Sequence, residues 1–507
     1  MFLAAQLNAS RRFATRRVLF KSSLTSRCCR DLSTSHLDPS IRDFGSSLAL
    51  KQPCFTLASK NVHVLNEPSQ FYVRLLEIIR RARRRIFLSS LYIGSSESGL
   101  LGALDTALRE NPTLHVYLTL DYNRSTRPGR SPVFTILPLL RNHERRVHVA
   151  LFRSPKLSKT MTKVVPPRFN EGWGTWHAKI YGSDDEVIIS GANLNKSYFT
   201  DRQDRYLHFT AQPTLANYCF SFLRTISGFS YNMFSAFGSD VPIVQWSDPS
   251  IEPWNIQSKV EQALSQFQAS HILSSISSNG MIEDNNSDDV LLFPIIQGGQ
   301  FNIREEERAM SMLFDHLVSQ ECRSDISPTM TMTSGYFGLY KHYQDLILRS
   351  SIECDIIVAS PKANGFFGSR GISGLIPEGY TLLEQRFMRA VRAAGRCANL
   401  TDGARNAVHL SEWEREGWTY HAKGIWLSPS PNTFPVLTLF GSTNLNSRSA
   451  NLDTELSFVM MTSSDALRES LHKEVNGLRQ WAVPWMGAER KVRWRTKAIV
   501  GLVGGML

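Results

Sequence analysis

A chain of 507 residues, 42% of them hydrophobic, is long enough to bury one large core or two medium ones. No apolar run approaches the roughly 20 residues needed to cross a bilayer, so we expect any membrane contact to be peripheral. The seven cysteines form no CxxC pair, which favours reduced thiols over a disulfide framework or a metal site. The formal charge of +12 is compatible with anionic substrates, an anionic membrane surface or nucleic acid.

Half of that charge lies at the N-terminus, where residues 1–36 hold seven Lys/Arg and one acid, Asp31. The segment MFLAAQLNASRRFATRRVLFKSSLTSRCCR mixes paired arginines with apolar residues and lacks the continuous apolar stretch of a secretory signal. This pattern predicts a basic amphipathic helix of the mitochondrial transit-peptide type over residues 1–40, disordered in the folded protein. A merely basic disordered tail is the alternative.

Helices and strands alternate along the rest of the chain. Apolar spacing predicts a helix over residues 67–85, a strand over 86–93, a helix over 100–109 and a strand over 114–121. The same order returns as a helix over 304–320, a strand over 329–337, a helix over 340–349 and a strand over 355–359. Residues 268–290 are rich in Ser, Asn and Asp, which predicts a polar linker or loop between two α/β sandwich halves.

An internal repeat supports this division. The first half contains EGWGTWHAKIYGSDDEVIISGANLN, and the second contains EGWTYHAKGIWLSPSPNTFPVLTLFGSTNLN. Both run from Glu-Gly-Trp into aromatic-His-Ala-Lys and then, through a β-rich stretch, into Asn-Leu-Asn. We therefore predict an α/β protein with two duplicated halves, residues 50–267 and 291–507, packed with pseudo-twofold symmetry around one active site.

Each copy of the repeat carries a His-x-Lys pair, His177/Lys179 and His421/Lys423. Residues i and i+2 of a strand point to the same face, so each histidine projects beside its lysine. Two such pairs that converge across a pseudo-twofold axis suit a phosphodiester. One histidine attacks phosphorus, the other protonates the leaving oxygen, and the lysines hold charge on the remaining oxygens. Fixed cations take the role of a divalent ion, so neither metal nor cofactor is expected.

Matched polar residues follow each pair. Asn193 and Asn444 stand at corresponding positions and could donate amide hydrogens to phosphate oxygens. Asp204 and Glu455 each follow their asparagine by eleven residues. Each could accept a hydrogen bond from a histidine of its site, which would orient the ring and stabilise its cation. A turn or cap role remains the alternative for any one of these residues.

These residues carry a family resemblance. HAKIYGSD at 177–184 with SGAN at 190–193 resembles the HKD motif of the phospholipase D superfamily, and HAK at 421–423 with GSTN at 441–444 is similar to its second copy. More narrowly, DDEVIISGANLN and YFTDRQDRY resemble the eukaryotic mitochondrial phosphatidylglycerophosphate synthase family. The resemblance extends from about residue 50 to the C-terminus. The second motif departs from the pattern at Ser428, where Asp is expected.

The resemblance implies transfer of a phosphatidyl group from CDP-diacylglycerol to glycerol 3-phosphate, peripherally, on the matrix side of the mitochondrial inner membrane. We assign His177 as the nucleophile because its motif is complete, His421 as the general acid, and Asp184 as a support of the first site. The rivals are a cardiolipin synthase-like or other phospholipase D enzyme, a nuclease, and an inactive membrane-bound protein. No nucleic-acid partner is expected, because no stacking module is present.

Outside the motifs the candidates are weaker. Arg124 and Arg127 follow a predicted strand end in LDYNRSTRPGR and could bind a substrate phosphate, or else lie in a solvated loop. Ser334-Gly335-Tyr336 and Lys362 follow two later strands and could line the pocket. Residues 481–507 mix tryptophans with Lys and Arg before an apolar tail, which suits an anionic bilayer surface or, alternatively, a core helix.

Overall fold

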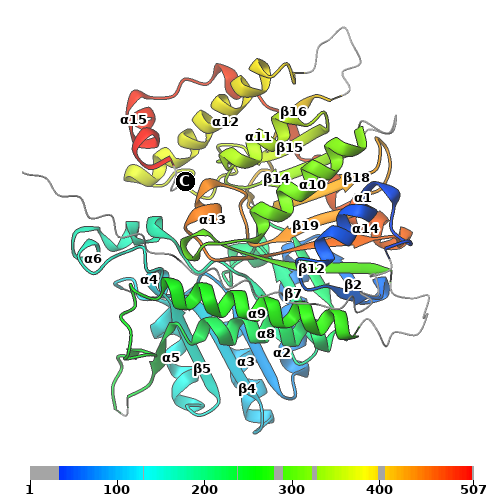
Figure 1. Cartoon of the computed structure of the whole chain (residues 1–507). Coiled ribbons are helices and arrows are strands. Elements are labelled where there is room, and N and C mark those ends of the chain that lie inside the picture. Colours follow the sequence, from blue (N-terminus) through cyan, green and yellow to red (C-terminus); the bar gives the residue numbers. More distant parts are fainter. Residues whose placement is uncertain are drawn as a thin grey trace, which may run out of the picture. The chain divides into compact units, whose positions relative to one another are not determined.

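Two mixed β-sheets, one for each half of the chain, repeat the same strand order in the computed structural model of the protein (Figure 1). The structure describes residues 34–504, apart from positions 130, 237, 279–288, 322–327 and 398–405. The first sheet runs β11 (Ile243–Trp246), β10 (Ser230–Phe234), β5 (Val147–Phe152), β4 (His115–Asp121), β3 (Arg85–Ser89), β6 (Ile180–Ser183), β7 (Glu186–Ser190), β9 (Tyr206–Phe209) and β2 (Val62–Leu65). The second sheet runs β1 (Phe55–Leu57), β12 (Val290–Gly298), β20 (Glu455–Thr462), β19 (Leu437–Gly441), β18 (Lys423–Ser428), β14 (Thr329–Ser334), β15 (Glu353–Ala359), β16 (Val408–Trp413) and β21 (Ala482–Pro484).

Each sheet joins a parallel part to an antiparallel part in the same way. β3, β4 and β5 are parallel, as are β14, β15 and β16. The strand that follows each His-x-Lys pair, β6 or β18, lies antiparallel beside the first strand of that parallel set. This correspondence confirms the prediction of duplicated α/β halves.

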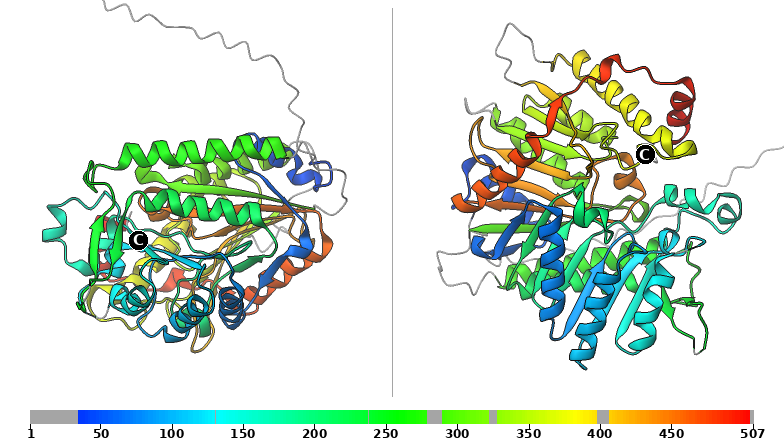
Figure 2. Two further views of the ribbon diagram at one scale, coloured as in Figure 1. Left: turned by 90° about the horizontal axis from the view of Figure 1, so that it is seen from below. Right: turned by 180° about the vertical axis from the view of Figure 1, so that it is seen from behind.

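Helices cover both sheets and fill the space between them (Figures 1 and 2). The outer layer of the first sheet is α2 (Pro68–Arg81), α3 (Ser98–Glu110) and α5 (Pro132–Asn142). The outer layer of the second is α1 (Pro39–Ala49), α10 (Glu305–Glu321), α11 (Lys341–Arg349) and α12 (Ile376–Ala393). The core between the sheets includes α8 (Pro213–Ser227), α9 (Gln257–Ser278) and α14 (Asp465–Arg479). The hydrophobic core is therefore divided into three layers by the two sheets.

Local sequence accounts for α2, the helix that begins the first half. In α2, Phe71, Leu75, Ile78 and Ile79 are buried along one face, as their spacing predicts. Pro68 occupies the first turn, where a missing N–H costs little. The helix ends at Arg81, four residues before the predicted end, and the chain then turns into β3.

The predicted boundaries of the halves need correction at both ends. β1 pairs with β12, and α1 packs against α10, so residues 39–57 belong to the second half although they precede the first. Residues 268–278, predicted as linker, continue α9, which buries Val260, Leu264 and Phe267 on its inner side. The apolar residues of α9 are too widely spaced among Gln and Ser to reveal a helix. Residues 1–33, which are most of the predicted leader, and residues 279–288, which are part of the predicted linker, lie outside the described residues.

Short strand segments of the two halves pair with each other beside the histidines. β8 (Arg202–Gln203) pairs in parallel with β17 (Thr419–Tyr420), and the His421 N–H donates to the Gln203 carbonyl at 2.8 Å. The second crossing mirrors the first: Trp176 bridges to Thr454, whose carbonyl accepts from the His177 N–H at 3.0 Å. Each histidine is therefore fixed by backbone hydrogen bonds to the opposite half. Within the described residues, no helix is both long and apolar enough to cross a membrane.

Candidate active site

The two His-x-Lys pairs lie at the starts of β6 and β18, where the halves cross. His177, Lys179, His421 and Lys423 are all buried. Each lysine turns back beside its histidine, and both Nζ atoms donate to the carbonyl of the histidine two residues earlier, at 2.6 Å. The side chains of each pair therefore share one side of the backbone, as the strand period predicted.

The carboxylates that orient the histidines come from the opposite half. His177 Nδ1 lies 2.9 Å from both oxygens of Glu455, and His421 Nδ1 lies 2.6 Å from Asp204 Oδ2. The predicted chemistry of Asp204 and Glu455 is present, but each acid serves the histidine of the other half rather than its own. Because each carboxylate occupies an Nδ1 atom, both Nε2 atoms remain for reaction.

Burial sets the protonation of these groups. It lowers the pKa of His177 below its usual 6.5, with the Glu455 carboxylate opposing part of that effect. It lowers the pKa of His421 well below 6.5, and the nearby Lys423 and Arg202 cations add to the effect. Burial also tends to raise the pKa of Glu455, but the His177 ring outweighs it and holds that pKa at about 2. Burial therefore favours the neutral form of both rings, whereas Glu455 is ionised at neutral pH.

Two tyrosines and an arginine surround His421. The rings of Tyr198 and Tyr336 meet the imidazole edge-on, each with centroids 5.2 Å apart, and the Tyr198 hydroxyl is 3.4 Å from Nε2. Arg202 lies over the Tyr198 ring at 4.7 Å. Asn193 Nδ2 donates to the Tyr198 hydroxyl at 3.1 Å, so this amide supports Tyr198 in the free protein. The prediction that Asn193 donates to phosphate stays open.

Acidic groups surround His177 instead. Asp453 stands two residues before Glu455, as Arg202 stands two residues before Asp204, and it pairs with Arg448 at 3.0 Å. His177, Asp453 and Glu455 bring potential metal-ligand atoms within 4.8 Å of one another. These atoms already take part in hydrogen bonds and the ion pair within the protein, so the described contacts account for the cluster without an ion.

Asp184 lies away from this centre, which corrects its assignment as a catalytic support. It follows β6, roughly 16 Å of strand from Lys179. Its carboxylate accepts hydrogen bonds from the backbone N–H groups of Arg83, Arg84 and Arg85 at 2.7–3.0 Å. Asp184 thus fixes the turn between β6 and β7 against the start of β3. It is a structural residue, and the absence of its counterpart at Ser428 does not alter the site.

The weaker candidates separate into two groups. Arg124 lies over the Tyr92 ring at 4.5 Å and pairs with Glu171 at 3.5 Å, and Arg127 pairs with the same carboxylate. Both arginines thus share one carboxylate at the edge of the site, which leaves one positive charge in excess there. The Lys362 side chain is 70% exposed and pairs with Glu414 at 3.1 Å, which makes it a surface residue in this structure.

Asn444, the second predicted asparagine, is buried beside the same centre. Its side-chain oxygen has no hydrogen-bond partner among the described residues. Its carbonyl accepts from Ser334 Oγ at 2.9 Å, which confirms that the strand end at Ser334 reaches the site. Arg202 and Tyr198 were not predicted, although both lie in the YFTDRQDRY segment. Alignment of the two repeats could have drawn attention to Arg202, because the corresponding position of the other half holds an acid, Asp453.

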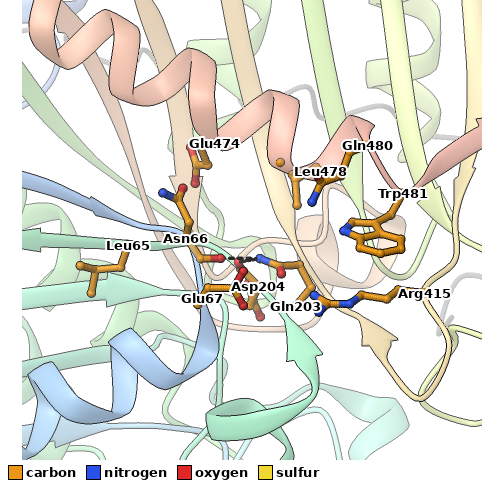
Figure 3. Close-up of a pocket in the computed structure, with 11 residues that line it drawn as sticks. Leu65, Asn66, Glu67, Gln203, Asp204, Arg415, Glu474, Leu478, Gln480 and Trp481 are labelled. Carbon is orange, nitrogen blue, oxygen red and sulfur yellow. Dashed lines mark hydrogen bonds between the residues drawn. The ribbon is translucent and has the colours of Figure 1, made fainter.

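A small cavity touches Asp204 from between the halves (Figure 3). Its volume is about 40 Å³, and it is lined by Asn66, Gln203, Arg415 and the end of α14. Gln203 Nε2 closes one side by donating to the Asn66 carbonyl at 3.1 Å. The space holds a few water molecules and neither a nucleotide nor an acyl chain, so it is no substrate site.

Comparison with known proteins identifies a solved structure with this fold and several related sequences. A phosphatidylserine synthase of Haemophilus influenzae Rd KW20 has the same fold, with a TM-score of 0.64 and 17% identity over 93% of this chain and 98% of its own. One curated relative is a probable CDP-diacylglycerol–glycerol-3-phosphate 3-phosphatidyltransferase of Dictyostelium discoideum, which is 33% identical over 93% of this chain and 81% of its own length. The CDP-diacylglycerol–glycerol-3-phosphate 3-phosphatidyltransferase of Schizosaccharomyces pombe is 32% identical over 89% of this chain and 95% of its own length. A mitochondrial enzyme of the same name from Homo sapiens is 32% identical over 83% and 78%. No family model matches the chain.

Two duplicated α/β halves with a paired His-x-Lys centre give the chain the fold of that phosphatidylserine synthase. Relatives above 30% identity extend over most of the sequence. The chain belongs to the CDP-diacylglycerol–glycerol-3-phosphate 3-phosphatidyltransferase family.

Proposed function

We propose that the protein transfers the phosphatidyl group of CDP-diacylglycerol to glycerol 3-phosphate, forming phosphatidylglycerophosphate and CMP. One observation carries the proposal: two crossed histidine–carboxylate pairs, each beside a buried lysine, lie close enough to influence one another electrostatically. Membership of a family named for this reaction supports the choice of substrates.

In the first step, His177 Nε2 attacks the phosphorus of the phosphatidyl group. Glu455 holds the proton on Nδ1, so the Nε2 lone pair is free. As the N–P bond forms, the P–O bond to CMP breaks, and the leaving oxygen takes a proton from His421 Nε2. Lys179 and Lys423 stabilise charge on the non-bridging oxygens. The anionic diphosphate offsets the effect of burial on His421 and favours its protonated form when substrate is bound.

In the second step, a hydroxyl of glycerol 3-phosphate attacks the phosphatidyl-histidine. Its proton passes to His421, which is neutral after the first step and acts as a base. The N–P bond breaks, phosphatidylglycerophosphate leaves, and His177 returns to its neutral form. The fixed lysines supply the positive charge in both steps, so the route uses no cofactor.

We also propose a mitochondrial location, peripheral on the matrix side of the inner membrane. Relatives from Gallus gallus and Homo sapiens are named as mitochondrial. The acid-poor basic sequence of residues 1–36 supports import. The membrane contact would lie at the C-terminal helix α15 (Trp494–Val503), which exposes Trp494 and Leu502 beside Arg495 and Lys497.

The direct test offers CDP-diacylglycerol to purified protein with glycerol 3-phosphate, glycerol, serine or water, one at a time, and identifies the lipid by mass spectrometry. We expect phosphatidylglycerophosphate with glycerol 3-phosphate and little product otherwise. Phosphatidylserine as the main product, or phosphatidate regardless of acceptor, would assign the chain to another reaction of the superfamily.

A further inference from the structure

Arg202 is a partly buried cation beside His421 that forms no ion pair with a carboxylate among the described residues. It opens β8, and its Nε atom donates to Thr419 Oγ1 at 2.9 Å. Its guanidinium lies over the Tyr198 ring, and Tyr198 in turn contacts His421. Arg202 therefore reaches the reaction centre from the side of the general acid.

Two other arginines near the centre differ from Arg202 in having carboxylate partners. Arg124 pairs with Glu171, and Arg448 pairs with Asp453. Asp453 occupies the position of Arg202 in the other half of the repeat, so the positive charge at Arg202 has no counterpart beside His177. A guanidinium that is partly shielded from water without a counter-charge costs free energy, and an anionic ligand would offset that cost.

The guanidinium packs closely against Gly365, where only a glycine leaves room for it. A Cβ atom on Gly365 would lie 2.3 Å from Arg202 Nη2 and 3.2 Å from the Tyr336 hydroxyl. The tip of Arg202 and the Tyr336 hydroxyl therefore lie close to each other beside residue 365, and the Tyr198 ring contacts both Arg202 and His421. A planar fork with neighbouring hydroxyl donors suits the oxygens of a phosphate.

We propose that Arg202, with the hydroxyl of Tyr336, binds the second phosphate of the nucleotide donor, the one that leaves as part of CMP. The inference rests on the proposed function. The two lysines serve the phosphorus that is attacked, and a diphosphate carries its other phosphorus one bridging oxygen away, on the side of the leaving group. His421 protonates that bridging oxygen, and Arg202 is the cation beside His421. Binding there would both select a diphosphate donor and stabilise CMP as it leaves.

Glycerol 3-phosphate also brings a phosphate, so the test must separate donor from acceptor. Exchange of labelled CMP into CDP-diacylglycerol requires the first step alone and proceeds without acceptor. We expect Arg202→Gln to lower kcat/KM for this exchange more than tenfold, Arg202→Lys to lower it less, and the KM for glycerol 3-phosphate to change less than twofold. Arg74→Gln, a half-exposed arginine on α2, is the matched control.

A binding measurement guards against a folding defect. Calorimetric titration should show that Arg202→Gln weakens CMP at least tenfold and leaves cytidine unchanged, which a general loss of structure would not do. Unchanged CMP exchange with a raised KM for glycerol 3-phosphate would assign Arg202 to the acceptor and overturn the inference, as would equal CMP binding in both proteins. Absence of exchange and transfer in the unmodified protein would instead contradict the proposed function.

Discussion

The crossed carboxylates define the chemistry at the scale of single residues. Because Glu455 faces His177 and Asp204 faces His421, each acid controls the histidine of the opposite half. Glu455→Gln keeps a hydrogen-bond acceptor near His177 Nδ1 but removes the negative charge that holds the proton on that atom. We expect it to slow formation of the phosphatidyl-histidine by about 10²–10⁴-fold, the usual range for general acid–base partners.

The measurement uses His421→Ala as the background, so that only the attacking histidine is probed. In that background Glu455→Gln should slow adduct formation strongly, whereas Asp204→Asn should slow it less, through Lys423 alone. Equal or reversed effects of the two substitutions would show that the pairs are not crossed during the reaction.

The sequence predicts most of these active-site residues but not the contacts that form between the two halves. The histidines, lysines, Asp204 and Glu455 are recognisable because they recur at equal spacing. The exchange of partners is invisible, since spacing within one half says nothing about the other. Gly191 shows the same limit: a Cβ atom there would lie 2.3 Å from Lys423 Nζ and 2.5 Å from Asp204 Oδ1. The Ser-Gly order at 190–191 thus follows from a contact between the halves.

At the scale of elements, α10 carries a buried acid that links stability to pH. Burial raises the pKa of Glu306 to about 8 from the usual 4.5, although Tyr343 and Thr443 donate to its Oε1 atom. The folded state therefore binds a proton that the unfolded chain has lost, and the stability this contributes falls as pH rises through 8. Between pH 6 and 9 the loss is about 2.7 kcal/mol for this group, because two pH units separate pH 6 from the folded pKa and each unit is worth about 1.4 kcal/mol.

Denaturant titrations at pH 6 and pH 9 test the linkage. Glu306→Gln, which cannot ionise, should lose about 2.7 kcal/mol less unfolding free energy over this interval than the unmodified protein. Glu110→Gln, at an exposed position, should behave like the unmodified protein. An equal loss in all three proteins would mean that Glu306 does not titrate in this range.

The helix α15 tests the proposed membrane contact. Thr496 and Val500 are buried, while Trp494 and Leu502 are 74% and 86% exposed. The sequence prediction for residues 481–507 grouped three tryptophans, but Trp485 donates to Glu384 within the fold, so Trp494 is the one that is strongly exposed. The surface role is therefore narrower than the sequence indicates, and residues 505–507 lie outside the described part of the chain.

Charge reversal on this helix should weaken vesicle binding. Each basic residue near an anionic surface contributes about 1 kcal/mol, so Arg495→Glu with Lys497→Glu should reduce binding to vesicles rich in anionic lipid more than tenfold. Arg493 is left unchanged because it pairs with Glu378. The control reverses Arg80 and Arg83 at the end of α2, remote from α15 in Figure 1. Equal binding by both double variants would remove α15 from the membrane contact.

At the scale of the whole molecule, the two halves cannot be separated cleanly. Residues 39–57 complete the second half from the N-terminal side, and Arg205 of the first half forms a buried ion pair with Glu474 of the second at 2.8 Å. The repeat predicts the duplication and the shared centre. It could not predict these contacts, because α1 and β1 have no counterpart in the repeated pattern and α9 has too sparse an apolar pattern.

The central claim is that the duplicated halves build one centre in which His177 carries the phosphatidyl group. Acid-quenched mass spectrometry of the His421→Ala protein after exposure to CDP-diacylglycerol tests it most directly, because CMP leaves with little help while the second step lacks its base. We predict a phosphatidyl adduct on His177 and no adduct in His177→Ala. An adduct on His421 in the His177→Ala protein, with none on His177 in the His421→Ala protein, would contradict the account.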